Sequence, residues 1–303
     1  MSDDIRTTTR PARAADLEQA QGLVIRSIND LTERHGFGAM ASVRPVDFQR
    51  FSLKDDPGGL WVAEADGEML GFAFSWVNGD FWFLAELFVS PEQQGRKIGS
   101  ELLMRTFDHA RKANARNKAL ITFTFNTVSQ ALYIRNGLIP RLPIYFFGAG
   151  RDALRASPGE KLRFTRLEHT SAHRDELASL DGGALGFSRD KHHGFLLSEP
   201  GTSGVLLYAG DACVGYAYVN ARGHVGPIAV ARPEVMDAAF RTALDLAADM
   251  DAPQVSAFLP GVNAPALRSA VSRGMRMSSP MVLVSDREFG DWTRYLPRNP
   301  GFM

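Results

Sequence analysis

A short polar turn at residues 94–100 has the residue types of an anion-binding loop. It reads Gln-Gly-Arg-Lys-Ile-Gly-Ser, and its two glycines are Gly95 and Gly99. An apolar, strand-like run ends before it at Val89, and apolar residues at helical spacing begin at Ile98. A helix start exposes unpaired N–H groups and the positive end of the helix dipole. The turn therefore predicts a phosphate-binding loop.

The glycine spacing separates this loop from two common phosphate motifs. A P-loop needs Lys-Ser/Thr after its second glycine, and the dinucleotide fingerprint needs G-x-G-x-x-G. The loop resembles instead the pyrophosphate loop of the GNAT N-acetyltransferase superfamily, Q/R-x-x-G-x-G/A, with Gln94 and Gly99 at the matching positions and Pro91 soon after the strand. Lys97 departs from the pattern, because the family usually has glycine there. The resemblance implies that backbone N–H groups of this loop hold the pyrophosphate of acetyl-CoA.

A second GNAT-like motif lies in the segment 126–138. The family pattern N-x-x-A-x-x-L/F-Y-x-x-x-G-F is met by Asn126, Ser129, Leu132, Tyr133, Gly137 and Leu138. The resemblance implies that Tyr133 protonates the leaving thiolate, since a phenol of pKa about 10 is a suitable acid. The alternative is a buried tyrosine with a packing role. Asn126 is either a coenzyme contact beside a capping box of Thr127 and Gln130, or the helix cap itself.

The strand that ends at Val89 completes the expected coenzyme site. In the resembled family, a backbone N–H of this strand stabilises negative charge on the thioester oxygen, and the strand pairs with the pantetheine amides. The expected coenzyme contacts are therefore Leu87, Phe88, Val89, Gln94, Gly95, Arg96, Lys97, Ile98, Gly99, Ser100 and Asn126.

An amine acceptor requires a base, because an amine of pKa about 10.4 is almost entirely protonated at pH 7. Glu86, at the start of the same strand, is the predicted catalytic base, and a solvated strand-end charge is the alternative. His35, in a segment expected to border the acceptor side, is a further candidate. His169 and His173 are four residues apart, but no third ligand is apparent, so no metal site is predicted.

The composition narrows the class of protein. A length of 303 residues is enough for two domains of about 150 residues each. Lys+Arg and Asp+Glu both number 34, so no net charge favours nucleic acid or an acidic membrane. One cysteine, Cys213, excludes an internal disulfide. The polar beginning of the sequence, with no apolar run of membrane-spanning length, indicates a cytoplasmic protein.

The elements expected around these motifs follow the GNAT order. Asp16 is the expected N-cap of a first helix, and a second helix is predicted near residues 46–53. Residues 60–90 contain three strand-like runs separated by Asp66-Gly67 and Asn78-Gly79. These dipeptides favour tight hairpin turns and predict an antiparallel meander. The loop with its helix, a strand, a short helix and a last strand complete the order.

The second half of the sequence resembles a degenerate copy of the first, as in tandem-GNAT proteins. Residues 64–74 match 209–219, but no Gln-x-x-x-x-Gly turn follows in the second copy, and Ala270 holds the position of Tyr133. The predicted fold class is α/β (α+β), with two tandem GNAT-like domains, each a mixed, mostly antiparallel sheet flanked by helices. The predicted boundaries are 1–148 for the catalytic domain, 149–163 for a linker and 164–303 for the degenerate domain.

The predicted function is acetyl transfer from acetyl-CoA to a primary amine of a small molecule or peptide. A non-catalytic acyl-CoA-binding sensor or scaffold is the alternative, and so is an interaction protein in which the second half does the binding. Neither nucleic acid, nor membrane, nor metal is an expected partner, and a homodimer stays open. The aromatic, proline-containing tail 289–303 is expected to pack on a domain.

Overall fold

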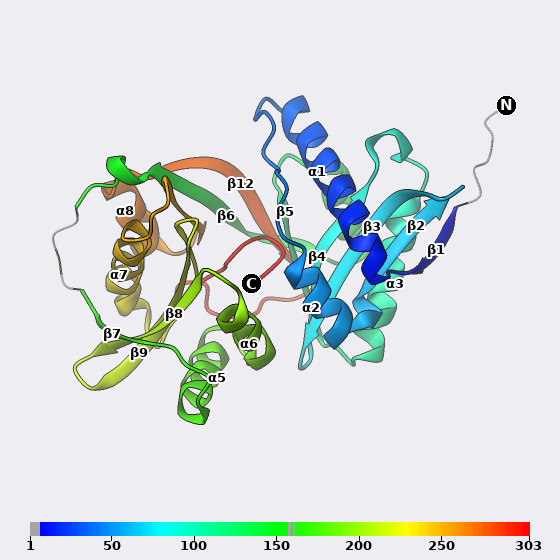
Figure 1. Cartoon of the computed structure of the whole chain (residues 1–303). Helices are drawn as coiled ribbons and strands as arrows, with labels where there is room; N and C mark the ends of the chain where they lie inside the picture. The colour runs from blue at the N-terminus through cyan, green and yellow to red at the C-terminus, as the bar shows by residue number, and fades with distance from the viewer. Residues whose placement is uncertain (1–6, 157–158, 160) are drawn as a thin grey trace. The chain divides into compact units, whose positions relative to one another are not determined.

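The computed structural model describes residues 7–156, 159 and 161–303, which divide into two compact units (Figure 1). The first unit is Met1–Leu120 with Phe125–Ile139, and the second is Ile121–Thr124 with Pro140–Met303. The boundary at residue 148 and the linker 149–163 stay predictions. Residues 1–6 of the predicted first domain, and 157, 158 and 160 of the linker, lie outside the described residues. No helix in the described part of the chain is long and apolar enough to cross a membrane.

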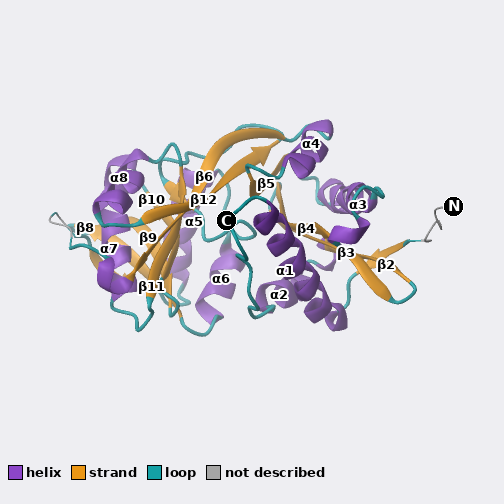
Figure 2. Ribbon diagram, turned by 90° about the horizontal axis from the view of Figure 1, so that it is seen from above, coloured by secondary structure: helices purple, strands orange, loops and turns teal. Residues whose placement is uncertain are grey.

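The first unit contains the predicted meander between helices. Its elements are β1 (Thr8–Pro11), η1 (Ala14–Asp16), α1 (Leu17–Arg34), α2 (Asp47–Asp55), η2 (Pro57–Gly59), β2 (Leu60–Ala65), β3 (Glu68–Asn78), β4 (Phe81–Val89), η3 (Pro91–Gln93), α3 (Ile98–Lys112), the start of β5 (Asn117–Phe123) and α4 (Thr127–Arg135). The strands follow one another in the order β1-β2-β3-β4-β5, and only β4 and β5 pair in parallel. Figure 2 shows α1 and α2 on one side of this sheet and α3 on the other.

Local sequence explains the hairpins of the first unit. Asp66 and Gly67 have φ values of 50° and 81°, and Gly79 has a φ of 57°. These left-handed conformations are the ones that tight two-residue hairpins require, and they confirm the predicted meander. Asp16 does directly precede α1, but its carboxylate accepts from the Arg13 N–H at 2.6 Å and from Arg10, so it does not cap the helix as predicted.

The second unit repeats the order of the first. Its elements are β6 (Ile139–Gly150), η4 (Arg151–Ala153), β7 (Arg163–Arg166), α5 (Ser171–Leu185), α6 (Asp190–Ser198), β8 (Thr202–Ala209), β9 (Ala212–Asn220), β10 (His224–Val230), η5 (Pro233–Val235), α7 (Met236–Ala248), β11 (Gln254–Pro260), α8 (Ala264–Ser272), β12 (Arg276–Ser285) and β13 (Tyr295–Leu296). From β7 to β12 the strands and α-helices match those from β1 to β6 one for one, whereas the short helices η1 and η2 have no counterpart between β7 and β8. The tandem, mostly antiparallel fold class is therefore confirmed.

Strand order in the second unit differs from chain order at one edge. The order is β12-β6-β11-β10-β9-β8-β7, with β13 on β10. β6, which ends the first repeat in the sequence, pairs antiparallel with β11 of the second repeat, for example Phe146 with Phe258. The β10–β11 pair is parallel, as the β4–β5 pair is. The last strand of the first repeat therefore forms part of the second unit.

Candidate active site

The predicted phosphate loop presents a row of unpaired backbone N–H groups. Gly95 and Lys97 adopt left-handed conformations with φ of 84° and 66°, and α3 begins directly afterwards at Ile98. Within the described part of the chain, nothing accepts from the N–H groups of residues 95–100. All of these residues except Ile98 and Gly99 are exposed. The loop and the first turn of α3 can therefore bind an anion through the main chain.

A surface hollow of about 430 Å³ adjoins this loop. Its lining residues are Thr7, Arg96, Lys97, Ile98, Ser100, Glu101, Met104, Arg105 and Asp108. Three of the side chains are cationic, and one of them, Arg105, lies 3.6 Å from Glu101 in an exposed ion pair. The cations and the free N–H groups together suit a phosphate-bearing ligand.

Lys97 keeps the backbone conformation of the glycine that the family pattern has at this position. A left-handed residue with a Cβ costs roughly 1–2 kcal/mol, while glycine loses more entropy on folding, by about 0.5–1 kcal/mol. We therefore expect Lys97→Gly to raise the free energy of unfolding by up to about 1 kcal/mol, measured in urea. Gly95→Ala is the matched control, since it adds a Cβ at a φ of 84° and should destabilise the protein. A clear loss of stability in Lys97→Gly would contradict this account of the loop.

The predicted coenzyme strand, β4, is paired on only one side where it approaches the loop. It follows β3 along its length, with a register shift at Ala85, but its parallel pairing with β5 covers only Phe81–Leu84. Residues 81–84 are buried, whereas 85–89 are partly exposed. Leu87, Phe88 and Val89 therefore lie on a strand segment whose second edge can take an additional strand.

Glu86 lies on this same segment, and the pKa of its carboxyl group is close to neutral pH. Gln49 of α2 donates its Nε2–H to Glu86 Oε1 at 2.9 Å. Although the residue is partly exposed, the loss of solvation at its carboxyl group raises the pKa of Glu86 to about 7, and the hydrogen bond from Gln49 lowers it in part. A carboxyl with this pKa is about half ionised at pH 7, which suits a general base.

The other predicted base, His35, has no contact with Glu86 among the described residues. It follows the end of α1, where its Nδ1 lies 2.8 Å from the Leu31 carbonyl oxygen. Its ring lies 4.9 Å from that of Phe125, measured between centroids. The structure therefore assigns His35 to a separate aromatic contact.

Tyr133 is the buried residue of α4, with 5% of its surface exposed. Burial raises the pKa of its phenol, against a smaller lowering by a hydrogen bond with Ser129. The phenol is therefore protonated at neutral pH and can donate a hydrogen bond. Asn126 is the N-cap of this helix and accepts from the Ser129 N–H at 3.2 Å, so of the two predicted roles the structure shows the cap.

The predicted phosphate loop, β4 and α4 converge at Gly99. A Cβ built on Gly99 would lie 3.5 Å from Val89 Cγ2 and 4.0 Å from Leu132 Cδ2. Gln94, at the start of the loop, also reaches back toward β4, with its Nε2 3.4 Å from the Val89 carbonyl oxygen. The two sequence motifs therefore meet in space, with Tyr133 on the helix that also carries Leu132.

A Ser-His-Asp arrangement in the first unit escaped the sequence analysis. Ser75 Oγ lies 3.0 Å from His109 Nδ1, and His109 Nε2 lies 2.9 Å from Asp56 Oδ1. The spacing resembles a nucleophilic triad, but Ser75 is completely buried and cannot reach a substrate. These contacts connect β3, α3 and the segment before η2. The residues are 34 and 53 positions apart in the sequence, so no local sequence pattern could have predicted that they meet.

In the described part of the second unit, neither the loop before the helix nor the carboxylate of Glu86 has a counterpart. η5 runs directly into α7, whereas residues 94–97 separate η3 from α3. Counting back from the end of β10, Pro227 stands where β4 has Glu86. His173 Nδ1 accepts from the Glu168 N–H at 3.0 Å, and the described residues contain no group of three metal-ligating side chains.

Comparison of the sequence with known proteins agrees with the motifs of the first unit. The model of the acetyltransferase (GNAT) family matches residues 26–138. An uncharacterized N-acetyltransferase of Archaeoglobus fulgidus is 30% identical over 115 residues, which cover 35% of this chain and 74% of that protein. A putative ribosomal protein bS18-alanine N-acetyltransferase of Bacillus subtilis is 27% identical over 95 residues, covering 31% of this chain and 63% of that protein.

Comparison with solved structures extends the likeness in fold to more than nine-tenths of the chain. A putative acetyltransferase from Pyrococcus horikoshii has a TM-score of 0.73 at 17% identity, with 95% of this chain and 92% of that chain covered. A tandem GNAT protein from the clavulanic acid biosynthesis pathway has a TM-score of 0.61 at 16% identity, with 92% and 98% covered. At these identities the likeness shows a shared tandem fold.

Proposed function

The chain belongs to the GNAT acetyltransferase family, and we propose that its first unit transfers the acetyl group of acetyl-CoA to a primary amine. The observation that carries this proposal is the convergence at Gly99 of an unpaired N–H loop, a strand with one open edge and the helix of Tyr133. The unpaired groups fit a pyrophosphate, and the strand edge fits the amides of a pantetheine arm.

Acetyl-CoA supplies an activated thioester, and the residues of the first unit supply binding and proton transfer. The N–H groups of residues 95–100 hold the pyrophosphate, and the open edge of Leu87–Val89 orients the arm and stabilises charge on the thioester oxygen. Glu86 takes the proton of the attacking amine, directly or through water. As the N–C bond forms and the C–S bond breaks, Tyr133 gives a proton to the departing sulfur.

The acceptor is a primary amine of a small molecule or of a peptide. Equal numbers of acidic and basic residues, 34 of each, provide no field that would select a polyanion. The Bacillus relative is described as acting on an alanine of a ribosomal protein. A peptide N-terminus therefore belongs among the acceptors to be tested, beside small amines.

Mass spectrometry of a mixed amine library tests this proposal. The purified chain is incubated with acetyl-CoA, with small amines and short peptides, and both thiol release and acetylated products are followed. Acetylated products that require the chain are the expected result. Tight acetyl-CoA binding without any product would support a non-catalytic sensor, and absence of binding would overturn the coenzyme site itself.

The pH dependence of turnover tests the role of Glu86. Because the pKa of Glu86 is raised to about 7, the active, ionised form accumulates as the pH rises, so kcat/KM should increase through about pH 7 and then level. Glu86→Gln should lower kcat/KM by about 10²-fold at pH 8 and remove this rise. Gln49→Ala is the matched control, since loss of its hydrogen bond should move the inflection to higher pH. An unchanged profile in Glu86→Gln would exclude this base.

Glu86 also gives a stability readout that does not depend on turnover. A carboxyl whose pKa is raised from 4.5 to about 7 on folding stabilises the protein fully below 4.5, and the contribution is lost as the pH rises through 7. Relative to the parent, Glu86→Gln should therefore gain melting temperature between pH 5 and pH 8. No relative gain would indicate that Glu86 ionises with an ordinary pKa.

Calorimetric titration with acetyl-CoA should saturate near one site per chain. Among the described residues, the N–H loop before the helix is found in the first unit alone, because η5 runs directly into α7 in the second. A clear stoichiometry of two would show that the second unit has a coenzyme site of another construction.

A further inference from the structure

The second unit contains the counterpart of the β4 edge. Gly71 pairs with Val89 in the first unit, and Gly215 pairs with Val230 in the second, with a register shift earlier in each strand. The residue after each valine is held in the same way, since Ser90 donates to the Leu70 carbonyl and Ala231 to the Val214 carbonyl. Val230 therefore occupies the position of Val89, and β10 that of β4.

Residues 294–296 of the same chain fill this edge in the second unit. β13 runs antiparallel to β10, with Leu296 opposite Ile228. The Val230 N–H donates to the Arg294 carbonyl oxygen at 2.9 Å, and Arg294 Nε donates back to the Val230 carbonyl oxygen at 3.1 Å. Since hydrogen-bonding direction alternates along a strand, the N–H groups of Val89 and Leu87 face the corresponding open edge of β4.

The tail also engages the counterpart of Asn126. Asn263 caps α8 and accepts from the Ala266 N–H at 3.2 Å, as Asn126 caps α4. Its Nδ2, however, donates to the carbonyl oxygens of Trp292 and Thr293, at 3.1 and 3.0 Å. Two landmarks of the first unit's coenzyme site, the strand edge and the cap, are therefore both contacted by the tail in the second unit.

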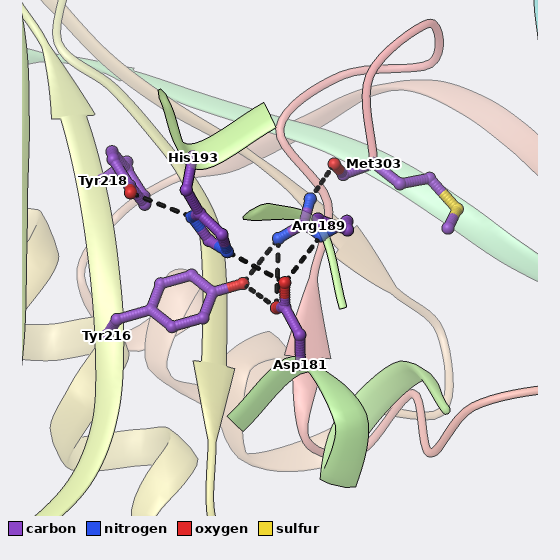
Figure 3. Close-up of polar contacts among 6 residues, drawn as sticks. All are labelled: Asp181, Arg189, His193, Tyr216, Tyr218 and Met303. Atoms are coloured by element: carbon purple, nitrogen blue, oxygen red, sulfur yellow. Dashed lines mark hydrogen bonds and ion pairs between the residues drawn. The ribbon is translucent and has the colours of Figure 1, made fainter. Parts of the chain in front are cut away.

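The end of the tail contacts a buried polar cluster through the main-chain oxygen of Met303 (Figure 3). The cluster consists of Asp181, Arg189, His193 and Tyr216. Arg189 Nε lies 3.1 Å from Asp181 Oδ2, and His193 Nε2 lies 2.8 Å from the same oxygen. Arg189 donates to the Tyr216 hydroxyl at 2.5 Å and, through its other amino group, to the main-chain oxygen of Met303. The Arg189 guanidinium also lies 5.1 Å from the centre of the Tyr295 ring.

Asp181 and Arg189 stay charged in this cluster although both are buried. Burial alone raises the pKa of Asp181, but the positive charge of Arg189, with the hydrogen bonds from His193 and Tyr216, holds that pKa below its usual value. Burial lowers the pKa of His193, so its ring is a neutral hydrogen-bond partner in this cluster. Asp181 and Arg189 are completely buried. A buried ion pair is costly unless its remaining polar atoms are also bonded, and the oxygen of Met303 is one of the groups that meet this need.

The apolar side chains of the tail enter the same region. Trp292, Tyr295, Leu296, Phe302 and Met303 are all at most 5% exposed. The tail thus combines main-chain pairing, apolar anchors and one polar contact with Arg189, which is how extended peptides are recognised at a sheet edge.

We propose that the second unit is a strand-binding module whose site is occupied by residues 291–303 as an internal ligand, of the class of an extended peptide with aromatic and aliphatic anchors. The site itself follows from the contacts of the second unit. Only its equivalence to the pantetheine edge rests on the function proposed for the first unit. Occupancy by the tail, in addition to the missing loop, excludes a coenzyme from the second unit.

A cleavable full-length chain tests the proposal. Arg287 and Glu288 are exposed, so a specific protease site can be inserted between them. After cleavage, the tail should co-elute with the remaining chain in gel filtration. A fluorescein-labelled peptide of residues 289–303 should then exchange into the cleaved chain, as followed by fluorescence anisotropy, and unlabelled peptide should compete with it.

Two control peptides keep the test specific. A peptide ending at Gly301 loses the buried Phe302 and Met303 and should bind at least tenfold more weakly, although it keeps the β13 pairing. A Leu296→Asp peptide places a charge at a position that is 1% exposed and should also bind at least tenfold more weakly. Equal binding of all three peptides would overturn the proposed anchors.

Unfolding of the cleaved chain after removal of its tail shows whether the tail is a ligand of the second unit or a strand that its core requires. We expect the second unit to keep a cooperative unfolding transition without the tail. Added peptide should restore the midpoint of this transition to the value of the intact chain. Loss of that transition, or absence of peptide binding, would overturn the proposal. These readouts use no acetyl-CoA, so a failure of acetyl transfer in the first unit would be recognised separately.

Discussion

Gly99→Asp is expected to lower the affinity for acetyl-CoA by about 10²- to 10³-fold while leaving the fold intact. A Cβ at this position meets Val89 and Leu132 at 3.5 and 4.0 Å, which is ordinary contact, so the backbone can accept a side chain. The added carboxylate, however, lies beside the unpaired N–H groups that we propose to bind the pyrophosphate. Two like charges about 4 Å apart near a protein surface repel by roughly 4 kcal/mol, which corresponds to about three orders of magnitude in affinity.

Two further substitutions of Gly99 separate the effect of the aspartate charge on coenzyme affinity from the effect of side-chain size. Gly99→Ala should bind acetyl-CoA within a few-fold of the parent, because its methyl group has room. Gly99→Asn matches the shape of aspartate without its charge and should be intermediate. Calorimetric titration of all three, with thermal melts, is the measurement. If the folded aspartate variant binds like the parent, the loop does not hold the pyrophosphate.

Features encoded by a few neighbouring residues could be predicted from the sequence. Asp66-Gly67 marks a hairpin because both residues adopt a positive φ, and Gly137 closes α4 at a φ of 81°. The turn before α3 was likewise expected from its glycines and from the apolar spacing that begins at Ile98, while its binding of a phosphate stays a prediction. Lys97 could be predicted only in part. Its difference from the usual glycine is visible in the sequence, but its left-handed backbone conformation is not. Among residues other than glycine, Asn and Asp adopt this conformation most often, so a lysine would not be expected to.

Features that depend on distant partners could not be predicted. The pKa of Glu86 is set by burial and by Gln49, which is 37 residues away in the sequence. The contact between Arg189 and Met303 spans 114 residues. The tail was correctly predicted to pack on a domain from its aromatic composition, but the strand edge that it pairs with is defined only by the folded sheet. The pairing of β6 with β11 is likewise a property of the assembled unit.

The role of Asn126 shows a local ambiguity that geometry resolves. Both Asn126 and Thr127 are residue types that cap helices, and the sequence allowed either one to begin α4. The hydrogen bond from the Ser129 N–H selects Asn126. In the second unit Asn263 caps α8 in the same way while its amide also binds the tail, so a capping asparagine still has donors for a ligand. A coenzyme contact by Asn126 is therefore compatible with its role as a cap.

Tyr133→Phe distinguishes between two possible roles of Tyr133, proton donation in catalysis and packing in the core. The substitution keeps the ring and nearly all of the buried surface of a side chain that is only 5% exposed, so coenzyme affinity and melting temperature should change little. Turnover should fall by about 10²- to 10⁴-fold, because a positioned proton donor to the departing sulfur is lost. The raised pKa of Tyr133 keeps the phenol protonated at neutral pH, so the proton is available, but it also makes the phenol a weaker acid than a free tyrosine until thiolate charge develops beside it.

Steady-state kinetics with any amine that turns over, alongside calorimetry and melts, measures these effects. A loss shared equally by kcat and kcat/KM identifies an interaction made in the transition state. Ser129→Ala is the matched control on the same helix, because it removes a neighbour of the phenol without removing the proton donor, and it should reduce turnover far less. If Tyr133→Phe turns over like the parent, the sulfur is protonated by another group. A large drop in melting temperature would instead assign Tyr133 to the core, since the hydroxyl would then be stabilising the fold through its bond with Ser129.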